Sequence, residues 1–259
     1  MFRLRKCSVA LNGKNALQHV DLEIKSGERV VIVGINGSGK STLLKLLNGL
    51  LEPSSGELFY KNQSLVGALA HDVEVRRMFR KEVVLLFQNI DAMLFNPTVR
   101  DEIAFAPKQV GLKDIDQTVK RWADTFGLCE LLDLPPFTLS GGEKKRVALA
   151  AIMAIEPEVL LLDEPSAHLD PAGVAWFVDF LQSLRGKTVV CSTHNLSLVA
   201  ELGDRVIVLS KDRTIMFDGT PAKLFSDNAL LIESGLAHKH LHRHLDEVHL
   251  HYHVHDQDS

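Results

Sequence analysis

Residues 34–42 read GINGSGKST, where Gly34, four further residues, Gly39, Lys40 and Ser41 have the spacing of a phosphate-binding loop. Glycines let backbone N–H groups close around phosphate oxygens, and the positive end of a following helix adds to the attraction. A lysine at this position reaches the β- and γ-phosphates, and the Ser41 hydroxyl is suited to Mg²⁺. The pattern therefore predicts a site for a nucleoside triphosphate.

Two adjacent carboxylates, Asp163 and Glu164, follow the apolar stretch at 159–162. In open α/β sheets, ligands bind at the carboxyl ends of the strands. The two carboxylates can have different roles. Asp163 can hold Mg²⁺ through water, while Glu164 orients and deprotonates an attacking water. The alternative is an acidic cap on a buried strand, and the presence of a phosphate loop in the same chain favours the catalytic interpretation.

A sheet has to position these groups, and the sequence contains the strands for one. Short, fully apolar runs typical of strands buried on both faces occur at 30–33, 83–87, 159–162, 188–191 and 206–209. Helical apolar spacing lies between them, and the phosphate loop runs from the first strand into a helical pattern. The predicted fold class is α/β, a P-loop NTPase with a mostly parallel sheet between helices.

Three further features indicate how the chain is organised. Val20, Leu22 and Ile24 alternate with charged residues, which predicts an N-terminal antiparallel β subdomain. Residues from about 92 to 155 have mostly helical patterns, which predicts an inserted helical subdomain. We expect an ATP-binding domain over 1–235 and a histidine-rich tail over 236–259.

Composition narrows the function classes. The 259 residues include 29 Lys and Arg against 33 Asp and Glu, a balance that argues against nucleic acid as a partner. The three cysteines are scattered and predict reduced thiols. The longest apolar run, 147–155, is nine residues, well below the roughly 20 that a membrane span needs. If the protein works at a membrane, other chains must span it.

A larger motif set shows a family resemblance. LSGGEKKRVALA at 139–150 resembles the signature of ATP-binding-cassette (ABC) ATPases. The set is completed in order by Gln88, the turn PSAHLD at 165–170, and His194. The resemblance extends over residues 1 to about 235, and it implies an ATPase that uses ATP and Mg²⁺.

The resemblance also implies roles for individual residues. In this family two cassettes dimerise head to tail, so that ATP held by one copy is capped by the signature of the other. The holding positions here are Gly34, Asn36, Gly37, Ser38, Gly39, Lys40, Ser41 and Thr42, and the capping positions are Ser140, Gly141 and Gly142. Gln88 would contact Mg²⁺ and the attacking water, His194 the γ-phosphate, and Asp170 would link the two sites.

Three positions depart from the family pattern. Ala10 stands nearest to where the family commonly stacks an aromatic ring on adenine, in the loop between the first two strands. His168 occupies the usual glycine position of the turn, and we favour surface variation there over a role at the dimer interface. Asn195 follows His194 where aspartate is common.

Residues 87–107, FQNIDAMLFNPTVRDEIAFAP, resemble the energy-coupling-factor and cobalt/nickel group of ABC importers. In that group this segment docks on a membrane scaffold, which implies a peripheral protein at the cytoplasmic face with separate scaffold and substrate-binding membrane subunits. The alternative is that Met93, Leu94 and Phe95 are core residues. The group also serves vitamins, and soluble ABC ATPases form a third possibility.

The tail bears on the cargo. Residues 238–244 and 249–255 form an 11-residue repeat that contains eight of the twelve histidines: His238, His240, His242, His244, His249, His251, His253 and His255. Imidazole suits Ni²⁺, Co²⁺ and Zn²⁺, so the tail favours Ni²⁺ or Co²⁺ as cargo. A helix with two histidine stripes and a hairpin with LDEV at 245–248 as its turn both fit the spacing. A solvated tail without metal is the remaining alternative.

Overall fold

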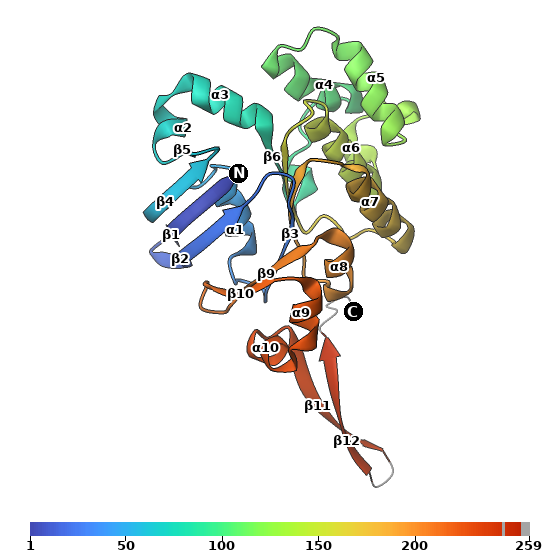
Figure 1. Cartoon of the computed structure of the whole chain (residues 1–259). Coiled ribbons are helices and arrows are strands. Elements are labelled where there is room, and N and C mark those ends of the chain that lie inside the picture. The colour runs from blue at the N-terminus through green and yellow to red at the C-terminus, as the bar shows by residue number, and fades with distance from the viewer. Residues whose placement is uncertain (245–246, 255–259) are drawn as a thin grey trace. The chain divides into compact units, whose positions relative to one another are not determined.

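The computed structural model describes the backbone of residues 1–244 and 247–254 and side chains as far as Ala237. The chain divides into two compact units, Met1–Gly67 with Thr188–Ser259, and Ala68–Lys187 (Figure 1). We call these the first and second units and describe each by itself. The phosphate loop belongs to the first unit, and the adjacent carboxylates belong to the second.

The first unit contains the expected N-terminal antiparallel sheet. Its strand order is β2-β1-β4-β5, formed by β1 (Phe2–Leu11), β2 (Lys14–Ile24), β4 (Ser55–Tyr60) and β5 (Gln63–Ser64). Asn12 and Gly13 join β1 to β2, and their φ values of 50° and 75° are those of a tight hairpin turn. Val20, Leu22 and Ile24 of β2 are buried, as their alternation predicts.

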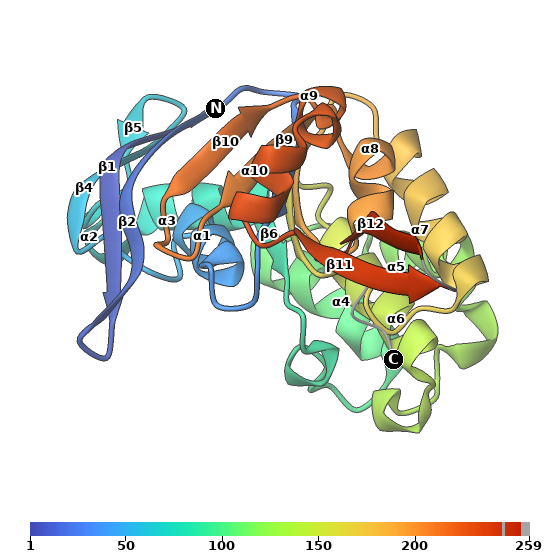
Figure 2. The same cartoon turned by 90° about the horizontal axis from the view of Figure 1, so that it is seen from below.

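A second group of strands in the first unit positions the phosphate loop. β3 (Arg29–Val33) lies between β8 (Thr188–Ser192) and β9 (Arg205–Leu209) and is parallel to both. β10 (Ile215–Gly219) lies antiparallel beside β9 (Figure 2). β3 is almost completely buried because all four residues from Val30 to Val33 are aliphatic.

The helices of the first unit follow its strands. α1 (Lys40–Leu47) begins directly after the phosphate loop and buries Leu43, Leu44, Leu46 and Leu47. The short helices are η4 (Leu196–Leu198), α8 (Val199–Leu202), α9 (Pro221–Ser226) and α10 (Asn228–Glu233). α10 is followed by its C-cap, Ser234, and by Gly235, after which the chain enters the tail.

The second unit pairs β6 (Val83–Leu86) in parallel with β7 (Val159–Asp163). α2 (Ala68–His71) and α3 (Val73–Glu82) precede β6, and α7 (Pro171–Ser183) follows β7. Between the two strands the regular elements are all helical. They are η1 (Ile90–Ala92), α4 (Val99–Val110), α5 (Ile115–Thr125), η2 (Cys129–Leu131), η3 (Pro136–Thr138) and α6 (Gly141–Met153).

Aromatic packing holds α5 and α7 together in the second unit. The ring of Phe126 lies 5.6 Å from that of Trp176 and 5.0 Å from that of Phe180, measured between centroids. Trp122, one turn earlier, lies 5.9 Å from Phe126. The α/β fold class is therefore confirmed, with an antiparallel N-terminal sheet, parallel buried strands and helices between them.

The tail forms an antiparallel hairpin of β11 (Ala237–His244) and β12 (Glu247–Val254). The structure thus has the hairpin and not the helix. Glu247 and Val248 belong to β12, so the expectation that LDEV forms the whole turn is wrong, because His244 pairs with Glu247 and only two residues remain between the strands. Those two residues, 245–246, and His255 lie outside the described residues.

Candidate functional site

The phosphate loop begins where β3 ends, and its glycines are required by close approaches. A β-carbon on Gly34 would lie 2.6 Å from the Leu209 carbonyl oxygen, and one on Gly39 would lie 2.6 Å from the Ala16 carbonyl oxygen. Gly39 also has a φ of 106°, which L side chains rarely adopt. Its conformation lets α1 begin immediately at Lys40, so the helix N-terminus faces the loop.

Lys40 is buried, and its ammonium group forms hydrogen bonds with the backbone of the phosphate loop. Its Nζ donates hydrogen bonds to the carbonyl oxygens of Gly34 at 2.8 Å and Ile35 at 3.4 Å. The Ser38 hydroxyl is also buried and has no hydrogen-bond partner within the described structure. A buried cation and a buried hydroxyl in a glycine-rich loop fit an anionic ligand that accepts from both.

His194 shares a cavity with the phosphate loop. The cavity has a volume of about 140 Å³ and is lined by Gly34, Ile35, Asn36, His194, Leu196, Gly235 and Leu236. The segment that carries His194 is fixed to β3, because the Thr193 amide donates to the Ile32 carbonyl at 3.1 Å. The structure therefore brings three of the predicted nucleotide-site residues together in the first unit.

Asn195 caps the short helix that follows His194. Its side-chain oxygen accepts from the Ser197 amide at 2.9 Å and from the Ser197 hydroxyl at 2.6 Å. Aspartate caps a helix equally well, which explains how asparagine replaces it here. Ala10, the other departure in this unit, is an exposed residue of β1 and not of the loop that follows.

In the second unit, Asp163 ends β7 and Glu164 follows it, and both residues are buried. Glu164 has a φ of 48°, a strained backbone conformation for a residue with a β-carbon. Such strain persists only where the surrounding structure holds it, and it is common at functional sites. The carboxylate of Asp163, the hydroxyl of Ser41 and the amide of Gln88 are all oxygen donors, the kind that Mg²⁺ prefers.

Lys145 of α6 is a residue that the sequence interpretation missed. It is buried, and its ammonium donates a hydrogen bond to the carbonyl oxygen of Ala167 in the turn after Glu164. Burial lowers the pKa of Lys145 from 10.5 to about 8, although the negative charge of Glu164 acts in the opposite direction. Lys145 thus connects the signature helix with the turn that follows the proposed catalytic base.

The signature residues open onto a cavity of about 510 Å³ in the second unit, which Ser140, Gly142, Lys145 and Asp170 help to line. The Ser140 hydroxyl accepts from the Glu143 amide at 3.4 Å, and the Glu143 carboxylate accepts from the Ser140 amide at 2.8 Å. This capping box starts α6 at Gly141 and lowers the pKa of Glu143. A β-carbon on Gly141 would meet nothing within 4 Å, so a ligand can approach its backbone closely.

Asp170 and His168 belong to the turn on the same cavity. The Asp170 carboxylate accepts from the Gly173 amide at 2.7 Å and caps α7, which gives Asp170 a structural role. His168 is exposed and has a φ of 61°, which explains why the family usually places glycine there.

Gln88 is exposed just beyond the end of β6, and the segment after it is held by Glu102. The buried Glu102 carboxylate accepts from the backbone amide of Asn96 at 2.5 Å and from its side-chain amide at 2.9 Å. Phe95 is 66% exposed and meets Phe105 edge to face at 5.0 Å between ring centroids. Phe95 is therefore not a core residue, while Met93 and Leu94 are half-buried.

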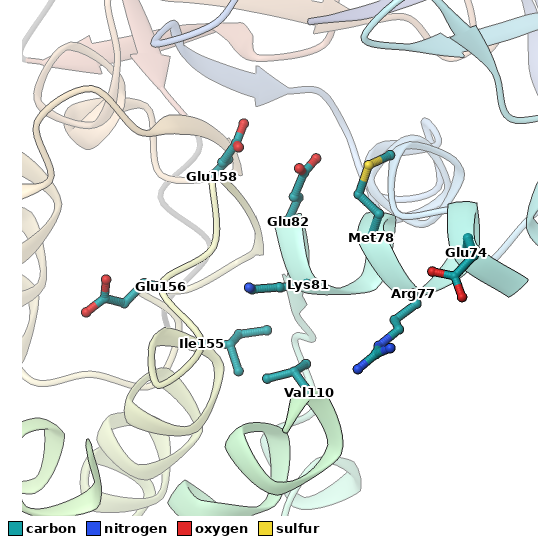
Figure 3. A pocket seen from close by; sticks show the side chains of 9 residues that line it. All are labelled: Glu74, Arg77, Met78, Lys81, Glu82, Val110, Ile155, Glu156 and Glu158. Atoms are coloured by element: carbon teal, nitrogen blue, oxygen red, sulfur yellow. The ribbon is translucent and has the colours of Figure 1, made fainter. Parts of the chain in front are cut away.

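A separate open cavity of about 470 Å³ lies in the second unit between α3 and residues 155–158 (Figure 3). Its charged lining has both signs, with Arg77 and Lys81 beside four glutamates: Glu74, Glu82, Glu156 and Glu158. None of the predicted nucleotide-site residues lines it. This mixed lining does not resemble an anion site.

Within residues whose side chains are described, no group of three or more His, Cys, Asp or Glu is arranged to hold a metal ion. No helix in the described part of the chain has both the length and the hydropathy of a bilayer span.

Comparison with known proteins agrees with these motifs. The family model described as ABC transporter matches residues 17–167. The energy-coupling factor transporter ATP-binding protein EcfA of Methanoculleus marisnigri is 42% identical over 227 residues, which cover 86% of this chain and 79% of that protein.

Two solved structures are also similar. CbiO1 from Clostridium perfringens, described as part of the ABC transporter complex CbiONQ, is 32% identical with a TM-score of 0.75, covering 91% of this chain and 94% of that one. The ATP-binding cassette MJ0796, solved as a dimer with ADP and Pi, is 27% identical with a TM-score of 0.77, covering 85% and 99%. The resemblance drawn from the motifs is confirmed: the chain belongs to the ABC transporter ATP-binding family and is an ATPase.

Proposed function

We propose that the chain is the ATP-hydrolysing motor of an importer for Ni²⁺ or Co²⁺ that has separate membrane subunits. The observation that carries the motor role is the cavity shared by Gly34, Asn36 and His194, because it combines the phosphate loop with the expected γ-phosphate contact. The protein would act peripherally at the cytoplasmic face of the cell membrane. Relatives named as energy-coupling factor transporter ATP-binding proteins support this assignment.

In the proposed reaction, Lys40 and the amides of the loop bind the β- and γ-phosphates of ATP. Gln88 orients a water, and Glu164 accepts a proton from it as its oxygen attacks the γ-phosphorus and the bond to ADP breaks. His194 holds the γ-phosphate in position. Ser41, Gln88 and Asp163 would hold Mg²⁺, which neutralises phosphate charge when bound.

The working form we propose is a dimer that encloses nucleotide. Ser140, Gly141 and Gly142 of one copy would cap the ATP of the other, and Asp170 would lie at the interface. The supporting observations are the exposed Ser140 and Gly141 at the start of α6, where a helix N-terminus attracts anions. The dimer of MJ0796 with ADP and Pi is a related arrangement in a similar protein.

The docking site for the membrane scaffold is, in this proposal, the segment that follows Gln88. Phe95 and Phe105 form an exposed aromatic pair, and aromatic side chains are enriched where proteins meet. The link from Asn96 to the buried Glu102 fixes the segment on α4, so the pair is presented on a defined support. Docking there would connect the membrane subunits to Gln88.

The cargo assignment depends on the tail. Imidazole binds Ni²⁺ and Co²⁺, whereas a histidine-rich hairpin has no evident use in vitamin import. An energy-coupling-factor ATPase that serves a vitamin is the alternative, because the names of the relatives do not specify a cargo. CbiO1, a similar protein, is described only as part of its transporter complex.

Purification from membranes separates these proposals from a soluble ABC ATPase. We would express the tagged chain in cells that carry the complete candidate transporter, solubilise the membranes and identify the proteins that co-purify. A motor subunit brings down a membrane-spanning scaffold and hydrolyses ATP in the complex. Recovery of active ATPase with soluble partners alone would contradict the transport role.

A further inference from the structure

The strand register of the tail places its histidines opposite one another. His238 is paired with His253, His240 with His251, and His242 with His249, while His244 is paired with Glu247. Directly opposite residues of an antiparallel pair share one face of the ribbon. The alternation of histidines predicts that each strand has its own histidines on one face. The register of the pairing adds that both strands place them on the same face of the ribbon.

The dimensions of such a ribbon suit metal binding. Opposite β-carbons lie about 4.5–5.5 Å apart, and metal–imidazole bonds are about 2.0–2.1 Å long. Successive pairs on the same face are about 6.6–6.8 Å apart along the strands. Two residues in directly opposite positions therefore have the spacing that two ligands of one ion require, and the three histidine pairs form separate units along the ribbon.

The base of the hairpin is fixed to the first unit. Leu236 and Ala237 are buried, and Gly235 has a φ of 74°. Beyond this base, an isolated two-stranded ribbon is marginally stable in water. A metal bound across the strands would stabilise the ribbon, because binding that requires a folded site contributes to folding.

We propose that the β11–β12 hairpin is a binding site for divalent transition metals, with cross-strand histidine pairs of a single chain as its ligand units. The site binds Ni²⁺, Co²⁺, Cu²⁺ or Zn²⁺, since imidazole nitrogen suits these ions. It rejects Ca²⁺ and Mg²⁺, because these ions prefer oxygen ligands. It is separate from the Mg²⁺ that accompanies ATP, and it does not depend on the cargo of the transporter.

The test uses two double variants of the full chain that remove equal numbers of histidines. His240→Gln with His251→Gln removes one opposite pair and leaves two intact. His240→Gln with His249→Gln breaks two pairs and leaves one intact. Lys239→Gln with Arg243→Gln changes the other face of the ribbon and serves as the control.

Isothermal titration with NiCl₂ at pH 7.5, in the absence of nucleotide, gives the amount bound. Relative to the wild type, we expect the opposite-pair variant to lose about one third of the bound Ni²⁺ and the two-pair variant about two thirds, since three histidine pairs are present. The control should bind as the wild type does. At pH 5.5 the affinity should fall at least about tenfold, because protons compete for imidazole.

Three results would overturn the proposal. One is an equal loss of bound Ni²⁺ in the two double variants, which would show that the strand register does not determine metal binding. Another is Ni²⁺ binding by the wild type no greater than that of a chain with glutamine at all six paired histidine positions. The third is a doubling of mass on adding Ni²⁺, measured by light scattering without ATP, which would place the ion between chains.

Discussion

Gly235 lies against Ile35, so the last residue before the tail touches the phosphate loop. A β-carbon on Gly235 would lie 3.0 Å from Cγ2 of Ile35, and both residues line the cavity that contains His194. The glycine also has a φ of 74°, where other residues are strained by about 1 kcal/mol or more. The chain therefore enters the β11–β12 hairpin directly from the cavity that the phosphate loop and His194 share.

Gly235→Ala should weaken ATP binding severalfold, because the added methyl group displaces Ile35 and the loop around it. Gly186→Ala is the matched control, since Gly186 has a φ of 73° and its added carbon would meet nothing within 4 Å. Both variants should lose about 1 kcal/mol of unfolding free energy. Urea unfolding and titration with a fluorescent ATP analogue measure the two effects. Equal ATP affinity in the two variants would show that contact with Ile35 is unimportant.

Glu164→Gln should reduce ATP turnover at least about a hundredfold and trap the ATP-bound dimer, because the amide cannot accept the proton of the attacking water. Glu158→Gln, at the exposed residue just before β7, should hydrolyse ATP normally. Phosphate release and size-exclusion chromatography with ATP provide the measurements. Normal turnover by Glu164→Gln would refute the role of this residue as the base.

Lys145 should make folding stability depend on pH. Its pKa in the folded chain is lowered to about 8 from 10.5, so between these values the unfolded chain binds more protons than the folded one. The wild type should therefore gain stability relative to Lys145→Met as the pH rises from about 8 to 10.5. Urea unfolding of both proteins across this range tests the shift, and a constant difference in unfolding free energy would contradict it.

Phe95→Ser should reduce co-purification with the membrane scaffold severalfold while the detached protein still hydrolyses ATP, because an exposed aromatic anchor is lost. Phe225→Ser is the control, since Phe225 is 37% exposed on α9 in the first unit. Quantitative pull-down from solubilised membranes measures the effect. Equal recovery of scaffold with both variants would remove Phe95 from the docking surface.

The local features of this chain could be predicted from its sequence. The phosphate loop, the strand before it and the two carboxylates depend on neighbouring residues, and the strand at 159–162 appears as β7 with Asp163 at its end. Lys145 was missed because it stands in a charged run next to Lys144. Helical spacing from Ala148 and Leu149, both buried, would have placed Lys145 on the same inward face.

Features that depend on distant pairing could not be predicted in the same way. The histidine repeat fits a helix and a hairpin equally, and only the pairing of His244 with Glu247 decides the register. The contact of Gly235 with Ile35 joins residues that are remote in the sequence. The positive φ of His168 is likewise a property of its turn and is not evident from a histidine in the sequence.

Uptake of radiolabelled Ni²⁺ and Co²⁺ by cells that carry the complete transporter tests the central claim most directly. With wild-type protein we predict uptake of one of these metals, and with Lys40→Ala we predict the level of cells that lack the scaffold, because the phosphate loop has lost its ammonium. Lys45→Ala, on the same helix, should support normal uptake. Uptake of a vitamin such as biotin that depends on Lys40, without uptake of either metal, would contradict the cargo and favour the vitamin alternative.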